Sequence, residues 1–109
     1  MRIWDLPPWR LCRAHLLGEH RELHAVWNII TRKKSGYSRH PETLRWKGKL
    51  RALYGRHDEL VEEMGRRGYE HRSPLRRELA AGAAVQKVLL ASLREQRARL
   101  GKKNCGCRV

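Results

Sequence analysis

The feature that most constrains this chain is a run of apolar residues at helical spacing between Arg10 and Thr31. These residues recur every three or four positions, which on a helix places them in one stripe at about 100° per residue. They are Leu16, Leu23, Val26, Trp27 and Ile30. Because Pro8 can occupy the first turn of a helix, we expect this helix to run from about Pro8 to Thr31.

Glu19 lies inside this apolar stripe, and His15 and Glu22 lie on its edge. A carboxylate among apolar side chains is costly unless it is paired or hydrogen-bonded. Two interpretations follow for Glu19: the face is partly exposed, or the carboxylate is buried and satisfied by one of the many arginines. Structural ion pairs and functional sites produce the same pattern, so spacing alone leaves the role of these polar residues open.

Two more helices are expected along the rest of the chain. The spacing of apolar residues predicts a second helix from about Glu42 to Arg67, with a possible break at Gly48. Ser73 and Pro74 suit the start of a third helix, which we expect to reach about Leu100. No alternation typical of strands occurs. We therefore predict an all-α fold, one compact domain of three main helices over residues 1–101 with a basic, disordered tail at 102–109.

The charge balance indicates a polyanionic partner. Lysine and arginine number 25 against 11 aspartate and glutamate, a formal net charge of +14. Such an excess, spread along the chain, favours nucleic acid over the alternatives of ribosome association or an anionic membrane surface. The loop Arg32–His40 places four basic residues around Tyr37, a composition suited to a phosphate backbone. No apolar run is long enough to span a membrane and no signal peptide is evident, so we expect a cytoplasmic protein.

The histidines and cysteines do not match a known metal motif. His20 and His24 are four residues apart, but the stretch reads H-R-E-L-H, with the glutamate in the wrong place for a zinc protease. Cys105 and Cys107 form a C-x-C without the second half that zinc sites usually have. Cys12 is expected to be a small apolar residue and His57 a satisfied core histidine. We therefore expect no metal site and no cofactor.

Several short motifs together resemble one enzyme family. They are M-R-I at the start, A-H-L-L-G-E-H-R-E-L at 14–23, K-L at 49–50 and E-L…R-R-G-Y at 59–69. Over roughly residues 1–70 the chain resembles the pyrimidine-dimer DNA glycosylases of the phage endonuclease V type, which are small, basic, all-helical proteins. The aromatic, basic C-terminal end of that family is missing here.

The resemblance implies a mechanism. The nucleophile would be the backbone amine at the N-terminus, which attacks C1′ of the damaged nucleotide and forms an imine. Here that amine would belong to Met1, because an initiator methionine is normally kept before a residue as large as Arg2. Glu22 matches the glutamate that assists β-elimination at the abasic site. An α-amino group has an ordinary pKa of about 7.7–8.0, so a useful fraction is neutral at physiological pH.

The resemblance and the basic loop together define the expected DNA contacts. They are Arg2, His15, Arg21, Lys33, Lys34, Arg39, Trp46, Lys47 and Lys49. Ala25 replaces a second arginine of the family's first helix, so the lesion could be a cyclobutane pyrimidine dimer or another damaged base. The expected partner is duplex DNA with a lesion or abasic site, bound by a monomer. The alternative is a non-catalytic nucleic-acid-binding protein on the same scaffold.

Overall fold

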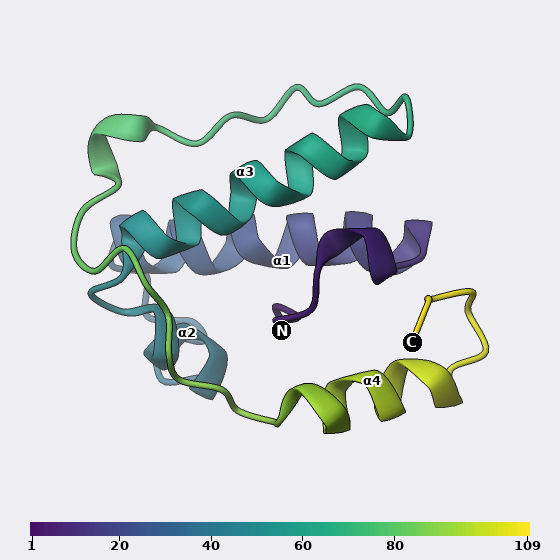
Figure 1. Ribbon diagram of the computed structural model, residues 1–109. Coiled ribbons are helices and arrows are strands. Elements are labelled where there is room, and N and C mark those ends of the chain that lie inside the picture. Colours follow the sequence, from purple (N-terminus) through teal and green to yellow (C-terminus); the bar gives the residue numbers. More distant parts are fainter.

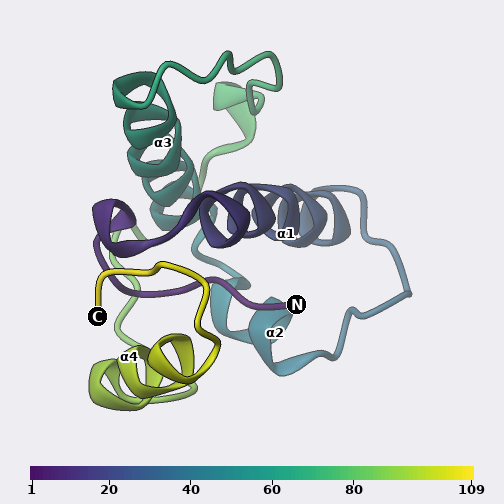
Figure 2. The same ribbon diagram turned by 90° about the vertical axis from the view of Figure 1, so that its right-hand side faces the viewer.

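Two long helices form the centre of the molecule. The computed structural model describes residues 1–109, and its main helices are α1 (Arg13–Thr31) and α3 (Leu50–Arg66). The short helix α2 (Pro41–Trp46) packs against both, and α4 (Leu93–Lys102) lies apart from them near the C-terminus. Figures 1 and 2 show that the N-terminal lead-in runs between the α1–α3 pair and α4. There is no strand, and the predicted all-α single domain is confirmed.

The first helix begins later than the sequence predicted. Residues Pro8–Arg10 form a separate 3₁₀ turn, η1, and the backbone of Leu11 and Cys12 is extended before α1 starts at Arg13. Leu11 is buried, so the interruption inserts its side chain into the core. The predicted end at Thr31 is confirmed.

The possible break at Gly48 is confirmed and divides the predicted second helix into α2 and α3. Gly48 has φ of 76°, a conformation that glycine adopts without the penalty other residues incur. The first amides of α3 have no partner within the helix. They donate instead to an extended segment near Gly82: Arg51 to the Ala81 carbonyl at 2.9 Å and Ala52 to the Ala83 carbonyl at 3.1 Å.

The predicted helix from Pro74 to Leu100 is wrong. Only the 3₁₀ turn η2 (Arg77–Leu79) and α4 are helical in this part of the chain. Ala83 donates its amide to the Gly48 carbonyl at 3.0 Å, and an isolated bridge joins Lys49 to Gly82. These tertiary contacts override the helical propensity of the alanine-rich stretch. The helix that does form begins after Ser92, whose hydroxyl accepts the amide of Glu95 at 3.1 Å.

The hydrophobic core lies between the lead-in, α1 and α3. Ile3, Trp4 and Leu6 of the lead-in are buried against Leu23 of α1 and Leu60 of α3, among other residues of one cluster. This packing fixes the first residues of the chain in place. No helix is both long enough and apolar enough to cross a membrane.

The prediction of a disordered tail at 102–109 is not confirmed. Residues 103–109 fold back toward the start of α1, as Figure 2 shows. The amide of Arg108 donates to the Arg10 carbonyl at 2.6 Å, and Cys107 packs against the core.

Candidate active site

A buried ion pair at the centre of α1 holds the lead-in. Glu19 is 2% exposed and accepts two hydrogen bonds from Arg56 of α3, at 2.6 and 3.0 Å, and one from the backbone amide of Trp4 at 3.0 Å. Burial raises the pKa of Glu19, and the charge and hydrogen bonds of Arg56 oppose that shift. Of the two interpretations of Glu19, the buried and arginine-paired one is therefore confirmed. The backbone amide of Trp4, two residues after Arg2, is therefore hydrogen-bonded to a side chain of α1.

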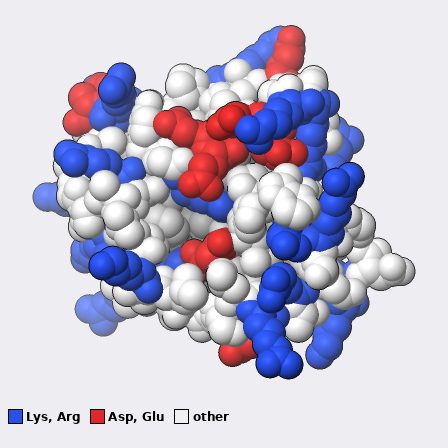
Figure 3. All heavy atoms as spheres, in the orientation of Figure 1, with Lys and Arg blue, Asp and Glu red and all other residues white.

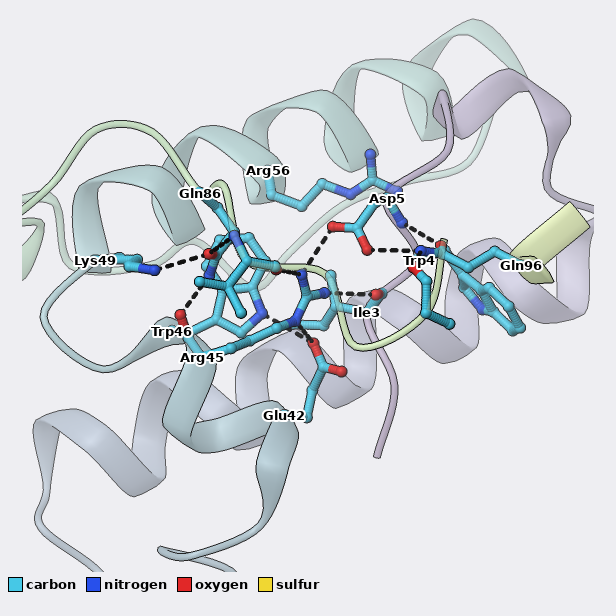
Figure 4. A network of polar contacts seen from close by, with 12 residues as sticks. Ile3, Trp4, Asp5, Glu42, Arg45, Trp46, Lys49, Arg56, Gln86 and Gln96 are labelled. Carbon is cyan, nitrogen blue, oxygen red and sulfur yellow. Dashed lines mark hydrogen bonds and ion pairs between the residues drawn. The ribbon is translucent and has the colours of Figure 1, made fainter. Parts of the chain in front are cut away.

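A second polar network fixes the lead-in from the other side (Figure 4). Arg45 of α2 is 5% exposed and donates to the Ile3 carbonyl at 2.9 Å and to Asp5 at 2.9 Å. Gln96 of α4 accepts the Asp5 amide at 2.8 Å and donates to its carboxylate at 2.9 Å. Sequence reasoning missed Arg45, Asp5 and Gln96, because their pairing joins elements far apart in the chain.

The N-terminus borders a pocket of about 640 Å³. Its wall includes Met1 and Arg2 of the lead-in, together with His15 and Glu22 of α1. The guanidinium of Arg2 lies 4.9 Å from the centre of the Trp4 ring, in a cation–π contact. The structure therefore brings together four of the residues predicted from sequence to act at one site.

Glu19 and Glu22 both line this pocket, but they differ in their hydrogen-bond partners. The three hydrogen bonds of Glu19 occupy both of its carboxylate oxygens, so neither oxygen is left without a partner inside the protein. Glu22 is half-buried and has no salt bridge and no side-chain hydrogen bond. Glu22 is therefore the carboxylate available for proton transfer in the pocket.

The opposite wall of the pocket comes from α4. Arg99, Lys102 and Lys103 line it, although 77 or more residues separate them in sequence from Glu22. Sequence reasoning missed these three residues because it placed Arg99 on a longer helix without a partner, and Lys102 and Lys103 in a disordered tail. Their spacing of three and four positions on a helix was the available signal. They surround the pocket with positive charge, suited to a phosphate backbone.

Most of the chain matches the model of a known protein family. A family model described as pyrimidine dimer DNA glycosylase matches residues 1–77. The chain belongs to this family. The match spans the lead-in and helices α1 to α3, and it leaves α4 and the tail outside. Searches among curated proteins and among solved structures gave no match. The resemblance stated from short motifs is thereby confirmed, and the protein is a DNA-repair glycosylase.

The other DNA contacts expected of the glycosylase fall in separate places. Lys33, Lys34 and Lys47 line a second hollow of about 410 Å³, beside the loop that contains the exposed Arg39. Arg21 is exposed on the flank of α1. These five residues stay predictions, and all five are accessible to a duplex.

Two of the expected contacts are engaged within the protein. Trp46 is 3% exposed and its indole N–H donates to Glu42 at 3.0 Å, so its place is in the core and not on a DNA-binding surface. Lys49 is half-buried and its ammonium donates to Gln86 at 2.9 Å. Both residues flank Gly48, where the chain turns between α2 and α3.

Positive charge covers much of the glycosylase surface but not all of it. Figure 3 shows lysine and arginine side chains around the edge of one face and acidic side chains gathered over α3. The acidic residues of α3 are Asp58, Glu59, Glu62 and Glu63. Phosphate repulsion disfavours this helix as a DNA contact, and the pocket lies elsewhere, between the lead-in, α1 and α4.

Two groups of potential metal ligands also assemble in the structure. One contains Cys12, His15, Cys105 and Cys107, and the other contains His20, His24, His57 and His71. Within each group the ligand atoms all lie within 4.8 Å of one another. The C-x-C of the tail thus has a second half, supplied by the start of α1 some 90 residues earlier.

Proposed function

We propose that this glycosylase excises a damaged base, a pyrimidine dimer above all, and then cleaves the strand at the resulting abasic site. The α-amine of Met1 acts as the nucleophile and Glu22 as the base. The observation that carries this proposal is that both residues line one pocket, in which Glu22 is the carboxylate without a partner.

The proposed chemistry has two stages. First, the amine of Met1 attacks C1′ of the damaged nucleotide, the bond from C1′ to the base breaks, and the base leaves with a proton from the amine. The bond from C1′ to the ring oxygen O4′ then breaks, and the remaining proton moves from nitrogen to O4′, which gives an open-chain imine. Second, Glu22 removes a proton from C2′, and β-elimination breaks the bond from C3′ to the phosphate oxygen. Water then hydrolyses the imine and frees the amine. The base must leave the helical stack for this attack, as in other enzymes that act on bases.

The contacts of the lead-in support this assignment. Trp4 is held by Glu19 and the Ile3 carbonyl by Arg45, so Met1 is only two residues from an anchored backbone. A nucleophile that is already positioned avoids much of the entropic cost of an ordered attack. Arg2 on one wall and Arg99 and Lys102 on the other supply cations for the phosphates that flank the lesion.

Borohydride trapping of the imine tests the proposal. The unmodified chain should form a covalent adduct with duplex DNA containing an abasic site, and the DNA should map to the peptide Met1–Arg2. A Gly-Ser extension before Met1, checked by mass spectrometry, should abolish the adduct because the new N-terminus is displaced from the pocket. The same extension after Val109 is the matched control and should leave trapping unchanged, since Val109 is 46% exposed.

The competing nucleophiles are Lys102 and Lys103, which line the same pocket. If either is the nucleophile, the adduct maps to the C-terminal peptide and the N-terminal extension has little effect. Either result would contradict the assignment to Met1. Salt-sensitive DNA binding with no adduct from any chain would instead favour the non-catalytic alternative.

A further inference from the structure

The three cysteines of the chain converge on one histidine. The Nδ1 atom of His15 lies 3.1 Å from the sulfur of Cys12, 3.4 Å from that of Cys105 and 3.5 Å from that of Cys107. The sulfurs of Cys105 and Cys107 are 3.5 Å apart. None of the three cysteines forms a disulfide.

These separations are those of a tetrahedral metal site. Zinc binds sulfur at about 2.3 Å and nitrogen at about 2.0–2.1 Å, which places the ligand atoms of a tetrahedron about 3.5–3.8 Å apart. Four of the separations between these ligand atoms are 3.1–3.5 Å, at or slightly below this spacing, and all four atoms lie within 4.8 Å of one another. Three soft thiolates and one imidazole are a typical ligand set of structural zinc.

The surroundings of the cluster suit thiolates. The Cys12 amide donates to the sulfur of Cys107 at 3.1 Å, a contact that stabilises negative charge on sulfur. Cys12 is also the N-cap of α1, where the helix dipole is positive. Zinc with three thiolates carries a net charge of −1, and the cluster lies in a chain of net charge +14, close to Lys103.

We propose that Cys12, His15, Cys105 and Cys107 bind one structural zinc ion, which fastens the tail to the start of α1. The tail beyond α4 contributes few apolar contacts of its own, so a metal is a physically reasonable way to hold it. The ion also fixes His15 and the adjacent α4 at the wall of the pocket. This inference does not depend on the proposed chemistry, because its tests measure metal and not activity.

A separate observation carries a second metal site. His20 and His24 of α1, His57 of α3 and His71 of the following link bring their rings within 5.1 Å of one another, centre to centre, in the pairs that contact. The Nε2 atoms of His24 and His57 are 3.2 Å apart, close to the separation of about 3.3–3.4 Å for two nitrogens on one zinc.

Two of these imidazoles have a ring nitrogen without a hydrogen bond. The Nε2 atoms of His20 and His71 are buried and have no hydrogen bond, a costly state for a polar atom. We infer that the four histidines bind a second zinc ion that joins α1, α3 and the link.

Metal content tests both sites. The full chain, expressed reduced with added zinc and purified without chelator, should contain two zinc ions per chain by elemental analysis. The double variant Cys105→Ser/Cys107→Ser should lose one ion, and His71→Gln should lose the other. Each is the matched control for the other, and His40→Asn, outside both clusters, should keep both ions. A variant that keeps its full zinc content overturns the site it alters, and a zinc-free wild type overturns both.

Cobalt distinguishes the two sites by their ligands. Cobalt(II) bound to the cysteine cluster should give thiolate-to-metal charge-transfer absorption, which His71→Gln keeps and the double cysteine variant loses. If the wild type holds a single ion with this absorption, the histidine site is overturned. If the wild type holds a single ion and shows no charge-transfer absorption, the cysteine site is overturned.

A measurement on the unaltered chain keeps the proposal testable if a variant fails to fold. The three thiols should resist iodoacetamide in the zinc-loaded chain and react after a chelator removes the metal, as counted by mass spectrometry. Equal alkylation with and without chelator would overturn the cysteine site. So would a disulfide between Cys105 and Cys107 in the freshly purified chain.

Discussion

The part of the chain that matches the family and the part that does not are held in the fold by different kinds of contact. Of the 24 buried residues, only Ala91, Gln96 and Leu100 lie beyond residue 77. Residues 1–77 enclose a continuous apolar core between the lead-in, α1 and α3. The remaining residues are attached chiefly by polar contacts, from Arg45 to the Val88 carbonyl and from Gln96 to Asp5.

The two parts of the chain therefore contribute different groups to the pocket. The first part supplies the groups proposed for the chemistry, Met1 and Glu22, from elements fixed by apolar burial. The second part supplies Arg99, Lys102 and Lys103, which can bind phosphate without taking part in bond breaking. A region with few apolar contacts can detach locally at a lower free energy than the core. We therefore expect changes in the two regions to separate catalysis from stability and from DNA affinity.

The largest effect is expected at Glu22. Glu22→Gln removes the base and should lower strand cleavage at an abasic site by roughly 10²–10⁴-fold, a typical contribution of a general base. Folding and DNA affinity should change little, because Glu22 has no ion pair to lose. Glu62→Gln, on the exposed face of α3, is the control and should keep full activity. Unchanged cleavage by Glu22→Gln in a single-turnover assay would exclude it as the base.

The sequence predicted the buried helix faces of the first region because the spacing of apolar residues along a helix is a local signal. The apolar spacing of α1 identified its buried face, and of the two interpretations left open for Glu19 the structure shows the buried, arginine-paired one. Gly48 marked the division between α2 and α3. The family match rests on the same stretch, in which helix periodicity and motif coincide.

The second region was predicted poorly because its structure depends on partners elsewhere in the chain. Residues 80–92 have the composition of a helix. Backbone contacts with Gly48 and Lys49 instead hold Gly82 and Ala83 in a non-helical conformation. The link between Cys12 and the tail had no local signal either, since it spans more than 90 residues. The spacing of apolar residues along a helix carries no information about such contacts between distant parts of the chain.

A smaller effect is expected where the second region joins the first. Gly82 has φ of 83°, and a Cβ there would lie 2.1 Å from the Gly48 carbonyl oxygen. Gly82→Ala should therefore cost about 1–3 kcal/mol and release the segment around residues 80–92, while α1 and α3 stay folded. Limited proteolysis should show faster cleavage in that segment, and helical circular dichroism should be largely kept.

Gly65→Ala is the matched control for this change. Gly65 lies within α3, and no atom would come within 4 Å of an added Cβ. The substitution should raise stability by about 0.4–1 kcal/mol, because alanine restricts the unfolded chain without strain in the folded one. Equal proteolysis of Gly82→Ala and Gly65→Ala would show that the contact between Gly82 and Gly48 does not hold the second region.

The smallest effect is expected from a single cation of α4. Lys102→Gln should weaken binding to abasic duplex about equally for all sequences and reduce the slope of log affinity against log salt by about 1, the loss of one phosphate contact. Single-turnover cleavage at saturating enzyme should stay unchanged, because Lys102 is assigned to phosphate and not to the bonds that break. Lys87→Gln lies in the same region but outside the pocket, and it should leave the slope as it was. A loss of cleavage rate in Lys102→Gln at saturation would instead place α4 in the chemical step, and the division of labour between the two regions would fail.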